Sequence, residues 1–363
     1  NTWYFDESIV FAGKGAERNN MLIDCFLEDE KDKRMFYKLN LLEPKEFQLK
    51  ADSLLDTKLK TFDEYIAKNP NETPGFKHIL KTALTYPIYA KKERYPVAHS
   101  KVSNQAMFKN IDQNFYNHRK SVHINNDTLM YFPPHSKYVG NYLYNITFEL
   151  GHSLSDKEYT SEFTVDLLNN IDQNLTSKEF KNAFLKQTVI GHFYRRSSCN
   201  IHQETFDTFF KLSTDDTDKK LVQQLLSDSK LLTKGQPLND FMITNFNNRR
   251  HSIKKLTKNK NTLLLFWNPI YVSQKFIRSR VNYLTEMFPQ VEFIQIRIQG
   301  KQQEAIPQLN PKNQFFITPK SNANNFLTSK MPRAIILNKK GIITNGFASI
   351  SSKKTYTDLK KLK

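Results

Sequence analysis

The chain has 363 residues, of which 39% are hydrophobic and 13% aromatic, and its formal net charge is +18. This apolar content excludes an intrinsically disordered chain, and no apolar run reaches the roughly 18 residues of a membrane-spanning helix. A chain of this length exceeds what one hydrophobic core usually serves, so we expect two domains.

The first 233 residues predict a mainly helical domain. Apolar residues recur at helical spacing, and Pro44 lies where a first helical turn accepts a proline. We expect Pro87 to kink or end one helix, Arg94–Ser103 to be a break, and Ser8–Gly13 to be a short strand-like or extended piece. The expected helices are Glu17–Leu39, Glu43–Asn69, Phe76–Glu93, Met107–His118, Lys137–Ser153, Phe163–Gln173, Lys178–Phe193, Gln203–Leu212 and Asp216–Leu231.

The remaining chain predicts alternating strands and helices. Thr262–Phe266 has the continuous apolar run of a strand that is buried on both faces. Ser273–Phe288 predicts a helix that crosses over to a parallel strand at Val291–Ile298. The other expected elements are a strand at Phe241–Thr244, a basic loop or short helix at Asn245–Lys260, irregular chain at Glu304–Asn325, a hairpin of Arg333–Leu337 with Gly341–Ala348, and a last helix at Asp358–Leu362.

The positive charge is concentrated near the C-terminus. From residue 235 onward, 22 lysines and arginines face five acids, a net charge of +17, so the first 234 residues carry only +1. Such asymmetry indicates an anionic partner or surface. A lysine- and asparagine-rich composition without a partner is the alternative, but a uniform bias would not spare the first 234 residues. The candidate basic patch is Arg249, Arg250, Lys254 and Lys255.

Two segments carry a family resemblance. NTLLLFWNPIYVSQK, at Asn261–Lys275, runs from the apolar strand through Trp267 and a short turn into a helix. SKMPRAIILNKKG, at Ser329–Gly341, places Met331-Pro332 ahead of a strand. Together they resemble the TlpA/ResA-like thioredoxin domains of bacterial envelope proteins of Bacteroidota type.

Two earlier stretches extend this resemblance towards the whole chain. FAGKGAERNNML, at Phe11–Leu22, is similar to a stretch that opens the helical region of such proteins, and GQPLNDF, at Gly235–Phe241, to the start of their thioredoxin domain. The resemblance implies an α+β protein, with an all-helical domain at 1–233 and a basic α/β thioredoxin-like domain at 234–363.

The redox motif of that family is absent. Its Cys-X-X-Cys positions, beginning four residues after the tryptophan, are held here by Tyr271-Val272-Ser273-Gln274. The family's chemistry needs a thiolate at a helix N-terminus and a resolving thiol one turn later. Neither Tyr271 nor Gln274 can replace these sulfurs, and Ser273 has no base beside it in sequence. We therefore expect a non-catalytic protein that acts as a binding or scaffold subunit.

The resemblance also implies a groove. Pro332 matches the position of the family's cis-proline, which borders the disulfide in active members and helps to present substrate. Without the two sulfurs, Pro332 either maintains the fold or borders a peptide-binding groove. The expected contact residues of this groove are Trp267, Tyr271 and Pro332.

The two cysteines support one alternative function, a thiol-disulfide oxidoreductase working through Cys199 or Cys25. Cys25 lies in an apolar helical pattern typical of a small core residue. Cys199 follows Arg195 and Arg196, which would favour its thiolate. A Cys25–Cys199 disulfide is left open.

Cofactors and metals have no sequence signal. The nine histidines are scattered, none forms HExxH or a paired Cys/His spacing, and no phosphate loop of the Walker type is present. The expected partners are an envelope protein and, through the basic patch, anionic lipid or lipopolysaccharide. Nucleic acid is not favoured, because no RNP-like, KH or helix-turn-helix signature is visible.

The resemblance implies an exported protein of the periplasm or outer membrane. No signal peptide is visible, and the chain starts at Asn1 without a methionine, so we expect a trimmed N-terminus. The resemblance implies that a signal peptide or a lipid-anchored residue precedes Asn1. Asp127-Thr128-Leu129 resembles the O-glycosylation pattern of some Bacteroidota envelope proteins, which makes Thr128 a candidate site.

Overall fold

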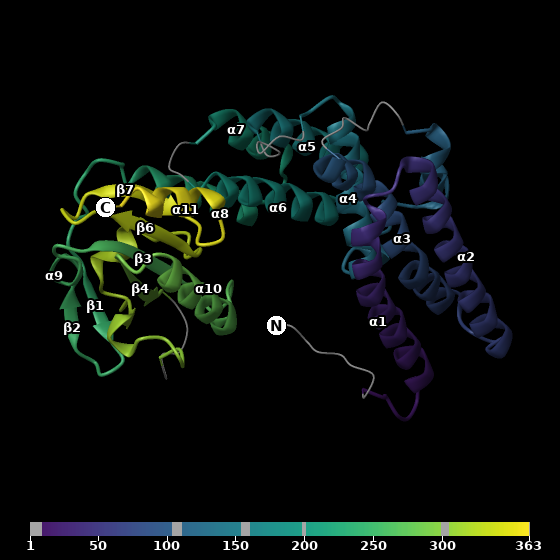
Figure 1. The fold of residues 1–363 in the computed structure, drawn as a ribbon, viewed down its shortest axis with the longest axis horizontal. Helices are drawn as coiled ribbons and strands as arrows, with labels where there is room; N and C mark the ends of the chain where they lie inside the picture. The colour runs from purple at the N-terminus through teal and green to yellow at the C-terminus, as the bar shows by residue number, and fades with distance from the viewer. Residues whose placement is uncertain (1–8, 104–110, 154–159, 198–200, 299–304, 363) are drawn as a thin grey trace. The chain divides into compact units, whose positions relative to one another are not determined.

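The computed structural model describes residues 9–103, 111–153, 160–197, 201–298 and 305–362 (Figure 1). The chain forms two compact units, Asn1–Leu185 and Lys186–Lys363, and the boundary falls within one helix, α6. Among the described residues, no helix combines the length and the apolar character that crossing a membrane requires.

The described part of the first unit is all-helical, as predicted. Pro44 is the first residue of its helix, where a proline loses no helical hydrogen bond. Residues 9–12 belong to neither a helix nor a strand. The helices are α1 (Ala16–Leu39), α2 (Pro44–Lys68), α3 (Pro74–Ser103), the 3₁₀ helices η2 (Gln113–Ser121) and η3 (Asp127–Leu129), α4 (Pro133–Glu149), α5 (Ser161–Asn174) and α6 (Lys178–Arg196).

The prediction that a break follows Glu93 is wrong. Helix α3 continues through Pro87 and Pro96 to Ser103. Each interior proline costs about 3 kcal/mol, because it removes one backbone hydrogen bond. Burial on both sides of the prolines offsets this cost, since Ile88 and Tyr95 lie in the core. The helix predicted at Met107–His118 falls partly outside the described residues, and its second half is 3₁₀ helix.

The second unit combines helices with a seven-stranded sheet. Its sheet order is β2-β1-β5-β4-β3-β6-β7. The elements that follow α6 are α7 (Gln203–Leu212), α8 (Asp216–Lys230), β1 (Met242–Asn245), β2 (Arg250–Ser252), α9 (Ile253–Leu256), β3 (Asn261–Trp267), α10 (Gln274–Met287), β4 (Val291–Arg297), η4 (Pro311–Asn313), β5 (Gln314–Phe316), η5 (Asn322–Phe326), β6 (Arg333–Leu337), β7 (Ile343–Ala348) and α11 (Lys353–Lys360).

The topology of this sheet is thioredoxin-like. Strands β3 and β4 are parallel and joined by α10, while β6 and β7 form the predicted antiparallel hairpin beside β3. The α+β class with a C-terminal thioredoxin-like part is therefore confirmed. The short strand β5, which pairs with β4, was expected to be irregular chain. Three residues are too few to show a period of two, so their sequence pattern could not reveal a strand.

Alternation along β3 divides the core of this unit into two layers. Leu263, Leu265 and Trp267 belong to the cluster that includes the apolar residues of α10 and α11. Leu264 and Phe266 belong to the cluster on the opposite face of the sheet. Leu265 therefore points towards α10.

The compact unit that contains the sheet begins well before residue 234. It includes the last turns of α6 and the whole of α7 and α8. Helix α8 belongs to this unit because the carboxylate of its Asp228 accepts hydrogen bonds from the loop that leads into β6. The change from helices to strands does occur close to residue 234, since α8 ends at Lys230 and β1 begins at Met242.

Candidate functional site

The turn that follows β3 holds Tyr271-Val272-Ser273-Gln274, the four positions that the resemblance aligns with a Cys-X-X-Cys motif. Both Tyr271 and Val272 donate their backbone N–H groups to the carbonyl of Asn268, each at 3.0 Å. Ser273 is the N-cap of α10, and its hydroxyl accepts a hydrogen bond from the Phe276 N–H at 3.2 Å. Gln274 opens the helix and is exposed. The serine therefore has a local structural role, while Tyr271 projects from the turn with 48% of its surface exposed.

The Met331–Pro332 peptide bond is trans, which corrects the expectation that Pro332 is a cis-proline. The trans isomer of an X-Pro bond is the more stable by about 0.5 to 1 kcal/mol. The surrounding chain accommodates that isomer: Asn268 donates its side-chain N–H to the Lys330 carbonyl at 3.2 Å, and the Tyr194 hydroxyl donates to the Pro332 carbonyl at 2.7 Å. Burial raises the pKa of Tyr194, so this hydroxyl stays protonated at neutral pH.

Asp228 fixes the start of the same loop. One oxygen of its fully buried carboxylate accepts hydrogen bonds from the N–H and hydroxyl of Thr328, and the other from the N–H and hydroxyl of Ser329, at 2.7 to 3.0 Å. The Arg333 guanidinium lies 3.9 Å from this carboxylate. It also lies 5.7 Å and 5.4 Å from the ring centroids of Phe326 and Phe347. A buried carboxylate and a buried guanidinium thus flank the loop.

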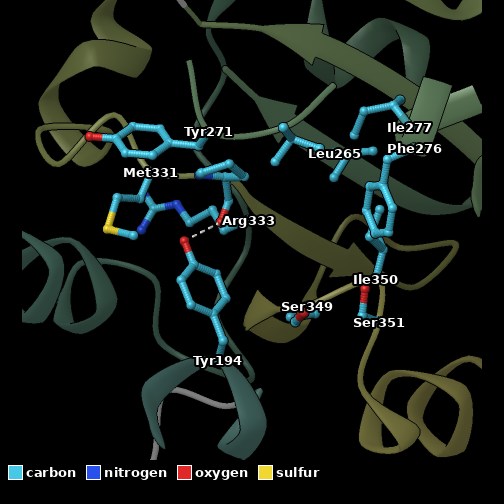
Figure 2. Close-up of a pocket in the computed structure, with 13 residues that line it drawn as sticks. Tyr194, Leu265, Tyr271, Phe276, Ile277, Met331, Arg333, Ser349, Ile350 and Ser351 are labelled. Atoms are coloured by element: carbon cyan, nitrogen blue, oxygen red, sulfur yellow. Dashed lines mark hydrogen bonds between the residues drawn. The ribbon is translucent and has the colours of Figure 1, made fainter. Parts of the chain in front are cut away.

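A cavity of about 310 Å³ opens between this loop, the Tyr271 turn, α10 and the segment after β7. Figure 2 shows the lining side chains, with Tyr194 reaching in from α6. The lining is mainly apolar. It consists of Tyr194, Leu265, Tyr271, Val272, Phe276, Ile277, Met331, Pro332, Arg333, Ala348, Ser349, Ile350 and Ser351.

The structure brings together two of the three predicted groove residues. Tyr271 and Pro332 both line the cavity, whereas Trp267 is only 2% exposed and lies in the core, with the Arg297 guanidinium 5.5 Å from its ring. Tyr194 and Asp228 were not predicted as residues of this region. The sequence could have indicated that Asp228 is buried, because it lies three residues after Leu225 and therefore on the same buried face of α8.

The polar side chains that line the cavity are two tyrosines, one arginine and two serines. None of its lining residues is a cysteine, histidine, aspartate or glutamate. Across the described ranges, no three or more such side chains are placed to hold a metal ion. What the arrangement offers is an apolar recess with an exposed tyrosine at its rim, which suits the binding of an apolar side chain.

The cysteines lie elsewhere. Cys25, in α1, is a free thiol with 7% of its surface exposed, and burial raises its pKa to about 12. A thiol of this kind stays protonated at neutral pH and is a poor nucleophile. Cys199 lies outside the described residues.

The predicted basic patch lies on a different part of the same unit. Arg249 and Arg250 are in the β1–β2 connection and the start of β2, while Lys254 and Lys255 are on α9. All four side chains are exposed. In the first unit, Thr128 lies in η3 and is exposed, with its hydroxyl donating to the Asn126 side chain at 2.7 Å; its glycosylation stays a prediction.

Comparisons with known proteins found similarity only among solved structures. No family model matches the chain, and no curated protein matches it significantly. A Chlorobium tepidum protein described as the thiol:disulfide interchange protein DsbE is 15% identical, with 35% of this chain and 96% of that chain covered and a TM-score of 0.30. A Bacteroides vulgatus protein described as a thiol-disulfide oxidoreductase is 16% identical, with 36% and 98% covered and a TM-score of 0.30. A thioredoxin domain of a thiol-disulfide oxidoreductase from Bacteroides vulgatus is 17% identical, with 31% of this chain and 87% of that chain covered and a TM-score of 0.26.

Proposed function

We propose that this protein is a non-catalytic, thioredoxin-like binding subunit, and that its cavity receives a large apolar side chain of a protein partner. The observation that carries the proposal is the mainly apolar cavity beside the Tyr271 turn, which is lined by Tyr271 and Pro332 and by no cysteine, histidine, aspartate or glutamate. A volume of about 310 Å³ accommodates one bulky side chain with part of its backbone.

The hydrogen bonds of the β6-side loop favour side-chain recognition over backbone pairing. The Lys330 and Pro332 carbonyls already accept hydrogen bonds from Asn268 and Tyr194. The N–H of Met331 already donates to the Ser329 hydroxyl at 3.4 Å. A partner strand could use the Met331 N–H only by displacing its bond to Ser329, so we expect apolar contact to supply most of the binding free energy.

The location of the subunit is part of the proposal. The resemblance of the Trp267 and Pro332 segments to envelope proteins supports an exported protein in a periplasmic or outer-membrane assembly. Fractionation of the source cells tests this point, and recovery of the native protein only with cytoplasmic markers would contradict it.

A charge introduced into the cavity tests the binding role. Phe276 lines the cavity and is 44% exposed, so glutamate at this position can fold while placing a carboxylate beside the apolar lining. We expect wild-type protein to select peptides with a large apolar residue from a synthetic peptide array. The Phe276→Glu variant should bind these peptides about tenfold or more weakly. The reason is that the free-energy cost of burying an unpaired carboxylate exceeds the free energy gained from the apolar contact.

Met287 provides the matched control. It lies on the same helix, is 48% exposed and does not line the cavity. The Met287→Glu variant carries the same new charge and should retain wild-type binding. Equal losses in both variants, or no peptide preference in the wild-type protein, would disprove binding in the cavity.

The alternative function, a thiol-disulfide oxidoreductase, gives the opposite result in a simple assay. We expect wild-type protein to leave the rate of insulin reduction by dithiothreitol unchanged, because Cys25 is buried with a raised pKa and the dithiol positions hold Tyr271 and Gln274. Catalysis that disappears in Cys199→Ser or Cys25→Ala would establish the alternative and refute the non-catalytic role.

A further inference from the structure

A second cavity, of about 210 Å³, lies at the opposite end of the sheet from Pro332. Strands β3 and β6 are antiparallel, and Phe266 pairs with Arg333 at one end while Thr262 pairs with Leu337 at the other. Three segments form the second cavity at the Leu337 end: residues 237–238, residues 253–259 around α9, and the β6–β7 turn at residues 337–341.

Four lysines line this cavity: Lys254, Lys258, Lys339 and Lys340. No ion pair of these four exists within the part of the chain that the structure describes, and no acidic residue lines the cavity. An acidic residue, Asp240, lies next to the cavity. Its carboxylate accepts hydrogen bonds from the Lys254 N–H and the Ser252 hydroxyl. Four ammonium groups around one cavity repel each other, and an anion between them reverses the sign of that interaction.

Hydrogen bonds hold the backbone frame of the cavity in place. The Leu238 N–H donates to the Gly341 carbonyl at 3.1 Å, which ties the β6–β7 turn to the segment before β1. Within the turn, the Asn338 side chain accepts from the N–H groups of Lys340 and Ile342 at 3.0 and 3.1 Å. The backbone of the site is therefore fixed before a ligand arrives, which lowers part of the entropic cost of binding, and the four exposed lysine side chains adjust to the anion.

The chemistry of the lining selects among anions. Lysine ammonium groups act as point charges that suit a phosphate, whereas a carboxylate is best matched by the planar fork of an arginine, and no arginine lines the cavity. Pro237, Leu238, Ile253 and Leu337 add apolar surface for an organic group. We propose that this cavity binds a phosphate monoester, with its phosphate between the four lysines and its organic part against Leu238.

The same chemistry occurs in a soluble sugar phosphate and in the headgroup of phosphatidic acid. Two binding experiments with the full chain distinguish the soluble ligand from the lipid. The first is calorimetric titration with glucose 1-phosphate, and the second is co-sedimentation with phosphatidylcholine vesicles with and without phosphatidic acid. Binding in either arm should be weakened about tenfold or more in the variant K254Q/K258Q/K339Q/K340Q, because each lysine contributes a charge-assisted hydrogen bond.

A second quadruple variant, K211Q/K220Q/K230Q/K234Q, controls for net charge. It removes the same number of charges from exposed lysines of the same unit that do not line the cavity. It should bind as the wild-type protein does, and circular dichroism should confirm that both variants are folded. If the cavity variant loses its fold, the milder K339Q/K340Q variant takes its place. Failure of both probes to bind, or equal losses in the two quadruple variants, would overturn the proposal.

Discussion

Replacing Glu93 with glutamine is expected to lower the free energy of unfolding of the helical unit by about 3 kcal/mol. The Glu93 carboxylate is fully buried and accepts hydrogen bonds from His118 at 2.9 Å, Asn145 at 2.7 Å and both Nε and Nη2 of Arg119 at 2.9 and 2.7 Å. Glutamine would turn an N–H₂ group towards these donors and remove the negative charge opposite Arg119. Urea unfolding followed by circular dichroism measures the loss, and hydrogen exchange should locate it to α3 and α4.

The Glu149→Gln variant is the matched control, because Glu149 binds the same guanidinium. Its carboxylate lies 3.2 Å from Arg119 Nη2, but the side chain is 36% exposed. An ion pair in contact with water contributes less than about 1 kcal/mol. A loss of similar size in the two variants would contradict the view that burial makes Glu93 critical.

The same carboxylate should make the helical unit sensitive to acid. Burial alone would raise the pKa of Glu93, but the hydrogen bonds and charges of Arg119 and His118 lower it from 4.5 to about 2. Because the folded-state pKa lies below that of the unfolded chain, the stabilisation is fully present above pH 4.5. It is lost as the pH falls through about 2, and amounts to about 3 kcal/mol. The difference in free energy of unfolding between the wild-type protein and the Glu93→Gln variant should become smaller as the pH falls over this range. A difference that does not change with pH would contradict the assigned pKa.

Long, continuous patterns made much of the second unit predictable. The apolar run of β3 and the amphipathic face of α10 each repeat one signal over several residues, and the Trp267 and Pro332 segments connect them to a thioredoxin-like arrangement. The end of helix α3 was predicted wrongly because proline usually ends a helix, and Pro96 lies in its interior. Tertiary burial of the neighbouring residues keeps the helix intact, and a local sequence pattern does not show that burial.

The candidate site was only partly predictable, for a related reason. Tyr271 and Pro332 lie in the segments with a family resemblance, so their place could be expected. Tyr194 meets Pro332 across 138 residues, and Asp228 meets Thr328 across 100 residues. Contacts between such distant positions arise from the fold, and a single sequence contains no direct record of them.

Replacing Asp228 with asparagine is expected to destabilise the second unit by about 3 to 5 kcal/mol. Its carboxylate accepts four hydrogen bonds from Thr328 and Ser329, and asparagine would point an N–H₂ group at half of these donors. The buried Arg333 would also lose the negative charge 3.9 Å away. Urea unfolding measures the loss, and weaker peptide binding by the folded fraction would show that the cavity has loosened. The Ser329→Ala control removes one hydroxyl donor and should cost only about 1 kcal/mol.

A double-mutant cycle with Arg333→Met separates the charge from the hydrogen bonds to the loop. Methionine keeps much of the volume between the Phe326 and Phe347 rings and removes the guanidinium. When the guanidinium is absent, the Asp228→Asn substitution no longer leaves a buried cation opposite a neutral side chain. The double variant should therefore be more stable than the sum of the single losses by about 0.5 to 3 kcal/mol. Additive losses would show that Asp228 acts through Thr328 and Ser329 alone, and that its charge does not support the guanidinium at the edge of the cavity.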